Sequence, residues 1–283
     1  MLHPVDQIIE ERCEKLRRKK FLWNIIRTPI FKALNYKEAK EITDIIFSKN
    51  GFDAFSYLVE ILDTSMRVEH LDFVPDKGAV LLAGNHPTGL IDGIVMFQVL
   101  KVKRPDYALY ANSDLIKLAP KFTDVIIPVE WIESERTSEK SRKTLKLTKE
   151  ALNNGRPLLS FSSGRLAKRM GIKLRERPWI TTVIKLSLKY NVPVVPFHIS
   201  ARNSFLYYFL DIVNEELKNV SLFHEMLNKK KMIYRIKFGM PIQPENFVGD
   251  IVSETKSLQN YVEYVLGEPP SLLENFKLTL FFN

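Results

Sequence analysis

Residues 81–93 read LLAGNHPTGLIDG, an apolar run that ends in a histidine, a proline turn and an aspartate. The run and the two residues before it predict a buried strand over Ala79–Gly84, and Ile91–Leu100 has the apolar pattern of the helix that follows. Asn85–Gly89 is then the turn at the carboxyl end of a strand, where open α/β sheets form their binding sites. We therefore expect a functional site at this turn.

The same alternation of short apolar runs and helical patterns continues along the chain. It predicts an α/β fold with a mostly parallel central sheet flanked by helices. We expect strands at Met66–His70, Ala79–Gly84, Asp106–Tyr110, Val125–Pro128, Pro157–Phe161, Val192–His198 and Met232–Gly239, and helices near Ile91–Leu100, Ser113–Leu118, Ser138–Asn153, Trp179–Tyr190, Ser204–Val213 and Val252–Leu266.

The N-terminal region shows only helical patterns. One helix is expected from Asp6 to about Leu34, and Pro29 should kink or end it. A second helix is expected over roughly Tyr36–Leu62, where apolar residues recur at three- and four-residue spacing. The predicted organisation is a helical hairpin at residues 1–64 and an α/β domain at residues 65–283.

Composition limits the class of protein. The chain has 283 residues, of which 45% are hydrophobic, and its net charge of +9 favours a negatively charged partner. Nucleic acid, an anionic membrane surface and a phosphorylated ligand all fit that charge. The single cysteine, Cys13, excludes an intramolecular disulfide and a multi-cysteine zinc site. No apolar run reaches the ~20 residues of a membrane-spanning helix, and no secretory signal pattern is present, so we expect a cytoplasmic protein.

His86 and Asp92 are the candidate catalytic pair. Asp92 lies within the first turn or so of the expected helix, and helical side chains tilt toward the N-terminus, so its carboxylate can reach back to His86. A carboxylate bonded to one ring nitrogen leaves the other nitrogen free to act as a general base. In the alternative, His86 bonds a backbone carbonyl and Asp92 only stabilises the helix N-terminus.

A second polar turn, SSGRLAKR at residues 162–169, follows the expected strand Pro157–Phe161. Its glycine allows close approach of a ligand to the backbone, and its three cations within five residues favour an anion. A solvated basic loop is the alternative. The Gly-x-Ser-x-Gly elbow of serine hydrolases is missing, which argues against a nucleophilic role for the two serines.

These segments resemble the glycerolipid acyltransferase family of the lysophosphatidic acid acyltransferase type. NHPTGLID is similar to its first block, with a five-residue spacer between His and Asp where the usual spacer has four. Phe161–Leu166 is similar to the block Phe-Pro-Glu-Gly-Thr-Arg at its Phe and Gly, but Ser163 stands in place of Glu. Its Ser-Gly-Arg form resembles a bacterial branch that includes lyso-ornithine lipid acyltransferases. Val192–Pro196 is similar to the fourth block.

The resemblance implies transfer of a fatty acyl group from acyl-CoA or acyl carrier protein to a hydroxyl of a lysolipid, in membrane phospholipid or ornithine lipid biosynthesis. It implies that His86 is the general base, that Asp92 orients it, and that no metal or cofactor takes part. The predicted substrate-binding residues are Asn85, Thr88, Gly89, Ser163, Gly164, Arg165 and Lys168.

Two segments have patterns that would suit a membrane surface with anionic lipids, and for the first of them a hairpin packed on the domain in the ordinary way is the competing account. Phe21 and Trp23 follow the basic run Arg17–Lys20, a pattern typical of interfacial helices, and the resemblance implies a peripheral protein whose N-terminal helices dock on the cytoplasmic face. The aromatic stretch Phe205–Leu210 favours a core helix, with an acyl-channel wall or a segment on the bilayer as alternatives. Lys229–Lys231 would then face the head groups.

Two other classes of protein compete with the enzyme. A non-catalytic, membrane-peripheral lipid-binding protein could keep the same fold with a degraded acceptor site. A nucleic-acid-binding protein ranks third, because the basic residues are spread along the chain and no recognition motif is evident. We therefore expect no nucleic-acid partner.

Overall fold

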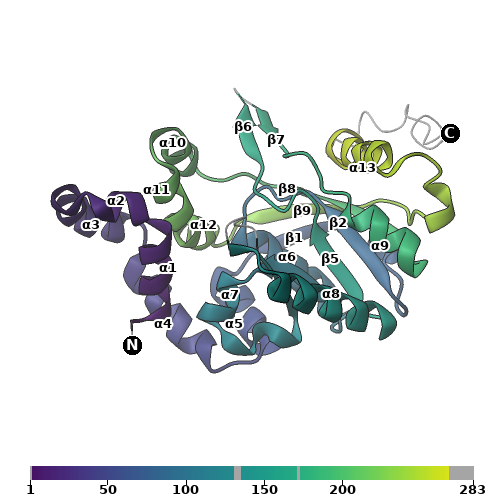
Figure 1. Ribbon diagram of the computed structural model, residues 1–283, viewed down its shortest axis with the longest axis horizontal. Coiled ribbons are helices and arrows are strands. Elements are labelled where there is room, and N and C mark those ends of the chain that lie inside the picture. The colour runs from purple at the N-terminus through teal and green to yellow at the C-terminus, as the bar shows by residue number, and fades with distance from the viewer. Residues whose placement is uncertain (1, 131–134, 171–172, 268–283) are drawn as a thin grey trace.

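The computed structural model describes residues 2–130, 135–170 and 173–267 (Figure 1). The last residues of the expected domain 65–283 thus lie outside the described part. The strands are β1 (Ser65–Glu69), β2 (Val80–Gly84), β3 (Ala108–Asn112), β4 (Ile126–Val129), β5 (Pro157–Phe161), β6 (Lys168–Met170), β7 (Lys173–Arg175), β8 (Val194–Ser200) and β9 (Ile233–Phe238).

Seven of these strands form one sheet in the order β1-β9-β8-β2-β5-β3-β4. All neighbours pair in parallel except β8 and β9, which are antiparallel. β6 and β7 form a separate antiparallel hairpin that projects from the body of the molecule (Figure 1). The structure thus confirms the predicted α/β fold with a mostly parallel sheet, and it adds the β6–β7 hairpin, which the sequence analysis did not predict.

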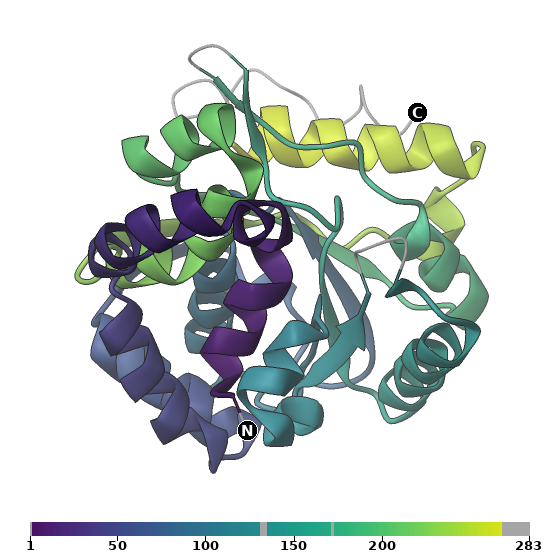
Figure 2. The same cartoon turned by 60° about the vertical axis from the view of Figure 1, so that its left-hand side comes forward.

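Helices cover both faces of the sheet (Figure 2). The α-helices of the described residues are α1 (Pro4–Arg12), α2 (Glu14–Arg18), α3 (Lys20–Ala33), α4 (Tyr36–Phe47), α5 (Gly51–Leu62), α6 (Leu90–Leu100), α7 (Asp114–Leu118), α8 (Ser138–Asn153), α9 (Thr182–Tyr190), α10 (Phe205–Val213), α11 (Glu215–Val220), α12 (Leu222–Leu227) and α13 (Ile251–Asn260), and η5 (Tyr261–Leu266) is a π-helical turn. In the described residues, no helix is long and apolar enough to cross a membrane.

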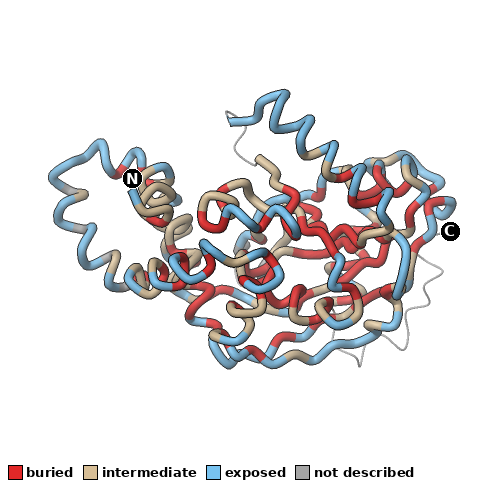
Figure 3. The backbone as a smooth tube through the Cα atoms, turned by 90° about the horizontal axis from the view of Figure 1, so that it is seen from below, coloured by how far each residue is buried: buried red, intermediate tan, exposed pale blue. Residues whose placement is uncertain are grey.

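The central strand β2 is apolar along its whole length because both of its faces are covered. Leu82 packs into the core formed with α5, α6 and β9, whereas Leu81 and Ala83 pack into the core formed with α8, α9 and η5. Figure 3 shows the buried segments gathered in the sheet, while long stretches of the N-terminal helices are exposed. The carboxyl end of β2 is therefore held rigidly between two packed layers.

The N-terminal region differs from the predicted two-helix hairpin, because residues 1–64 form five helices. Pro29 lies inside α3 without ending it, and the rings of Trp23 and Phe31, before and after the proline, contact each other edge-to-face. The second expected helix is interrupted at Ser48–Asn50, where the Asn50 side chain accepts a hydrogen bond from the backbone N–H of Asp53 and begins α5. Side chains of α4 and α5 also join the core beneath the sheet.

The lysine run was predicted to face lipid head groups, and for Lys229 this is wrong. Lys229 is buried, with its ammonium 2.9 Å from Oε2 of Glu225. Glu225 also accepts hydrogen bonds from the backbone N–H and the hydroxyl of Ser204, the N-cap of α10. Burial raises the pKa of Glu225, but the bonds from Ser204 and Lys229 outweigh it and hold that pKa below its usual value. This pair joins α12 to the start of α10.

Replacing Lys229 by alanine should lower the free energy of unfolding by about 3–5 kcal/mol, because Glu225 would be left as a buried, uncompensated charge. Lys230→Ala is the matched control, since the partly exposed ion pair of Lys230 with Glu38 should contribute at most ~1 kcal/mol. Urea unfolding of both variants and the wild type measures the difference. Equal losses for the two variants would contradict the buried pair as an anchor.

Candidate active site

The loops that follow the neighbouring strands β2, β5 and β8 meet at one edge of the sheet. Ala167 donates its backbone N–H to the carbonyl oxygen of His86 at 3.0 Å, which joins the second loop to the first. The carboxamide of Asn85 donates to the carbonyl of Ile199 at 2.9 Å and accepts from its N–H at 2.7 Å, which joins the first loop to β8. The turn that carries His86 is thus fixed from both sides.

His86 and Asp92 form the predicted pair. Nδ1 of His86 lies 2.8 Å from Oδ2 of Asp92. The other donors to this carboxylate are the backbone N–H groups of Thr88 and Gly89, at 2.8 and 2.9 Å, and the Thr88 hydroxyl. With so many donors aimed at it, the fully buried carboxylate acts as an acceptor, so Nδ1 of His86 donates to it. Asp92 therefore orients the ring and also caps α6, which combines the two alternatives that the spacing left open.

The imidazole of His86 makes a stacking contact in addition to its hydrogen bond with Asp92. Its ring stacks on that of Phe161, with centroids 4.2 Å apart and planes 10° from parallel. The side chain is 19% exposed, and within the described residues Nε2 takes no hydrogen bond. An imidazole with Nδ1 fixed as donor and Nε2 open is the arrangement of a general base.

The basic loop after β5 presents cations at the same edge. Gly164 adopts a φ of +63° in open space, where a side chain would be strained. The neighbouring Arg165 and Lys168 are exposed, and the described residues give neither an ion pair, while the side chain of Arg169 lies outside the described part. The Ser163 hydroxyl donates to the carbonyl of Arg165 at 2.6 Å. Neither Ser162 nor Ser163 is hydrogen-bonded to His86, so no serine triad forms among the described residues.

Comparison with known proteins shows which family these residues resemble. A family model described as acyltransferase matches residues 65–200, which contain the His86–Asp92 pair and the basic loop. Residues 65–200 form an acyltransferase-family domain. This confirms the family that the three sequence blocks predicted.

Two curated proteins are similar to this acyltransferase, and both are named lyso-glycine lipid O-acyltransferase. The one from Phocaeicola vulgatus is 24% identical over 224 residues, 77% of each chain. The one from Bacteroides thetaiotaomicron is 23% identical over 267 residues, 92% of this chain and 94% of its own. The crystal structure of the 1-acyl-sn-glycerophosphate (LPA) acyltransferase from Thermotoga maritima matches with a TM-score of 0.47 and 16% identity, covering 90% of this chain and 98% of that one.

Four of the predicted substrate-binding residues are engaged by the protein itself, and one of them is the buried Ser163 described above. Both polar atoms of the Asn85 carboxamide are bonded to β8, and Thr88 and Gly89 are bonded to Asp92. Gly89 has a φ of +96°, and a Cβ there would lie 3.2 Å from a methyl of Leu166 and 3.3 Å from one of Leu222. The groups left open toward a ligand are in the basic loop, at Gly164, Arg165 and Lys168.

Glu176 is a site residue that the sequence analysis did not single out. Its Oε1 accepts the backbone N–H of His86 at 2.9 Å. Burial raises the pKa of Glu176 to about 7, although the N–H and the charge of His86 act to lower it. No spacing pattern marks this residue, because the hydrogen bond joins the segment after β7 to the turn after β2.

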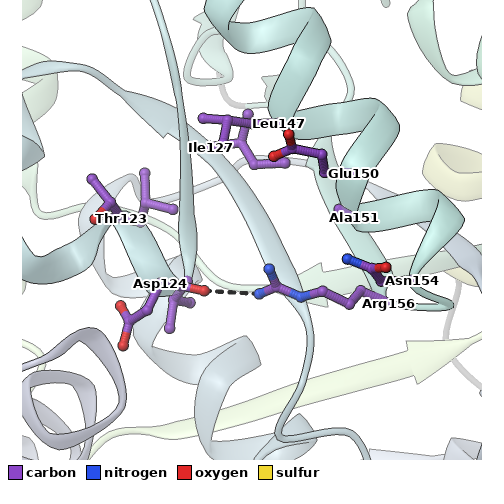
Figure 4. A pocket seen from close by; sticks show the side chains of 10 residues that line it. Thr123, Asp124, Ile127, Leu147, Glu150, Ala151, Asn154 and Arg156 are labelled. Carbon is purple, nitrogen blue, oxygen red and sulfur yellow. Dashed lines mark hydrogen bonds between the residues drawn. The ribbon is translucent and has the colours of Figure 1, made fainter.

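Other candidate groups do not form a site. A pocket whose lining includes Asp124, Glu150 and Arg156 lies where β4 begins and α8 ends, at the opposite edge of the sheet from His86 (Figure 4). The Arg156 guanidinium there donates hydrogen bonds to the backbone carbonyls of Asp106, Tyr107 and Asp124. His198 has its pKa lowered to about 4 by burial, and its ring is bonded to the Val262 carbonyl. Among the described residues, no three His, Cys, Asp or Glu side chains converge on a metal position.

The turn at Gly89 gives a stability prediction. Gly89→Ala should lower the free energy of unfolding by about 1–3 kcal/mol from backbone strain, and more if Leu166 and Leu222 cannot move aside. Gly78→Ala is the control, because Gly78 also has a positive φ, +85°, but no atom lies within 4 Å of its added Cβ. Denaturant unfolding compares the two variants. A loss at Gly78 as large as that at Gly89 would show that the packing over the turn contributes nothing.

Proposed function

We propose that this acyltransferase transfers a fatty acyl group from a thioester, acyl-CoA or acyl carrier protein, to a hydroxyl of a lysolipid, with His86 as general base and Asp92 orienting it. The observation that carries the proposal is the ring geometry: Nδ1 of His86 is hydrogen-bonded to a buried carboxylate, while Nε2 has no hydrogen-bond partner in the part of the chain that the structure describes. The family match and the names of the two relatives support acyl transfer to a lysolipid.

In the proposed reaction, Nε2 of His86 takes the proton of the acceptor hydroxyl as its oxygen attacks the thioester carbonyl. A carbon–oxygen bond forms, the carbon–sulfur bond breaks, and the proton passes from the imidazolium to the leaving thiolate. The products are an ester and a free thiol. The proton taken from the hydroxyl ends on the thiol, and no atom changes its oxidation state. The proposed reaction therefore requires no metal ion or cofactor.

We propose that the acceptor head group ends in a free carboxylate. Arg165 and Lys168 offer two exposed cations beside a glycine that leaves room for a ligand, and guanidinium binds a carboxylate as well as a phosphate. A lysolipid whose glycine is attached through its amino group would present such a carboxylate, and so would a lyso-ornithine lipid. The glycine form is the first choice because both relatives are named for it.

The first test is thiol release from a long-chain acyl-CoA, repeated with the acyl carrier protein thioester. The acceptors are lyso-glycine lipid, lyso-ornithine lipid and lysophosphatidic acid, and mass spectrometry identifies the product. His86→Ala should lose about 10²–10⁴-fold in rate, because the general base is gone. His70→Asn is the control and should keep wild-type activity, since His70 is an exposed residue whose positive φ asparagine tolerates.

The acceptor that turns over fastest identifies the head group. No thiol release from either donor with any acceptor, or equal rates for His86→Ala and the wild type, would overturn the enzymatic proposal. The lipid-binding alternative predicts lipid binding that does not depend on His86.

We further propose that the protein works as a peripheral protein on the cytoplasmic face of a membrane with anionic lipids. Phe205, Phe209, Ile212 and Val213 of α10 are exposed on one stripe of the helix, and Phe205 and Ile212 are 77% and 86% exposed. Tyr207 and Tyr208 of the same helix are buried, so the aromatic stretch is core on one side and apolar surface on the other. α10 begins directly after the β8 loop of the site.

The N-terminal helices extend this apolar surface with positive charge. Phe21 is 82% exposed, and the basic run Arg17–Lys20 is exposed beside it. α11 joins the two parts, because it packs against α10 and its Glu216 accepts the backbone N–H groups of Lys15 and Leu16 (Figure 1). Exposed apolar rings beside cations suit a membrane interface whose lipids carry negative charge.

Vesicle flotation tests the membrane contact. Replacing Phe205 and Phe209 together by serine should weaken binding to vesicles of mixed neutral and anionic lipid at least tenfold. Full burial of one such ring contributes ~1.5–3 kcal/mol, so partial burial of the two rings is enough for this loss. Replacing Val248 and Val252, which are also exposed, by serine is the control and should leave binding unchanged. Unchanged flotation of the α10 variant would contradict this surface as the contact.

A further inference from the structure

Both the backbone and the ring of His86 are held by the chain segment from Phe161 to Glu176, which carries the basic loop. Its carbonyl oxygen accepts from Ala167, its N–H donates to Glu176, and its ring stacks on Phe161. The N–H lies beyond the end of β2, where no strand partner remains for it. A backbone carbonyl or an amide oxygen would satisfy this N–H equally well, but the chain places a carboxyl group there.

We propose that Glu176 is a positioning residue of the acyl transfer, which holds the His86 turn and places a negative charge beside the imidazole that becomes positive during the reaction. This inference rests on the proposed function of His86. Asp92 bonds the ring at Nδ1, whereas Glu176 acts from the backbone side of the same residue. A charge fixed in a partly buried site stabilises an opposite charge that develops in the transition state.

The surroundings of Glu176 are suited to this role. Within the described residues its Oε2 is buried and takes no hydrogen bond, so part of the carboxylate is not neutralised by a donor. Burial opposes the ionised form, and the charge of Glu263 on η5 does so to a smaller degree, whereas the backbone N–H and the charge of His86 favour it. Of the two neighbouring cations, Arg175 lies over the ring of Tyr264 and is hydrogen-bonded to its hydroxyl, whereas the Nε of Arg177 is buried and has no hydrogen-bond partner among the described residues.

The ionised form of Glu176 lowers the stability of the fold. The pKa of this group is raised from 4.5 to about 7 by burial. Its contribution to stability is therefore full below pH 4.5 and is lost as the pH rises through about 7. A residue that served only as a hydrogen-bond acceptor would not need this charge. A glutamine at position 176 would also accept the His86 N–H, and the fold would be more stable at pH 8 than with the ionised glutamate.

Glu176→Gln separates the charge from the hydrogen bond, because glutamine keeps the size and an acceptor oxygen. Above pH 7 its kcat should fall about tenfold with little change in KM, as loss of one nearby unit charge predicts. The ratio of wild-type to variant kcat should approach one near pH 5.5, where Glu176 is protonated in the wild type. The Tm of the variant should exceed that of the wild type at pH 8 and match it at pH 5.

Glu263→Gln provides the companion measurement. Removing the charge of Glu263 lowers the pKa of Glu176, so in a Glu263→Gln background the pH above which Glu176→Gln lowers kcat should fall, while kcat of Glu263→Gln alone at pH 8.5 stays unchanged. A ratio of wild-type to Glu176→Gln kcat that is one at every pH, or a Tm of Glu176→Gln below the wild-type value at pH 8, would overturn the proposal for Glu176. In that case His86→Ala would still be inactive. A wild type without turnover would instead remove the proposed function and the role of Glu176 together.

Discussion

The site depends on one buried carboxylate, that of Asp92. A charge without exposure to water is tolerated only where hydrogen-bond donors surround it, and here Thr88, Gly89 and His86 are those donors. Satisfying Asp92 therefore fixes the turn after β2, the start of α6 and the position of the imidazole at once. The positive φ of Gly89 is the backbone geometry that lets its N–H point at the carboxylate.

Around this carboxylate, the groups at the sheet edge divide into two kinds. Buried groups such as Asn85 and the Glu225–Lys229 pair connect the loops to the sheet and to one another. With its carboxamide nitrogen turned toward them, Asn203 donates to Glu225 at 3.2 Å and to the Thr88 carbonyl at 3.3 Å, which links the segment before α10 to the turn that carries His86. The groups open to a ligand, Nε2 of His86 and the cations of the basic loop, are thus carried on a rigid frame.

Local signals predicted the main elements from sequence, and long-range partners explain what was missed. β5 and α8 match their predicted bounds, since Thr137 caps α8 and Pro157 begins β5. Asn50 before Gly51 is an N-cap signal inside the second expected helix, and it marks the point where that helix is interrupted. Glu225 stands four residues before Lys229, which is the spacing of a helical ion pair. The His86–Asp92 pair could be predicted from sequence because both residues lie on one turn. The contact of Glu176 with His86 could not be predicted, because only folding of the sheet edge brings these two residues together.

The central claim is that His86 and Asp92 act as one catalytic unit, and a double-mutant cycle tests it most directly. Single-turnover rates would be measured for the wild type, His86→Ala, Asp92→Asn and the double variant with the preferred acceptor. We expect the double variant to be no slower than the slower single variant, because Asp92 acts through His86. Rate losses that multiply in the double variant would show two independent contributions and contradict the account.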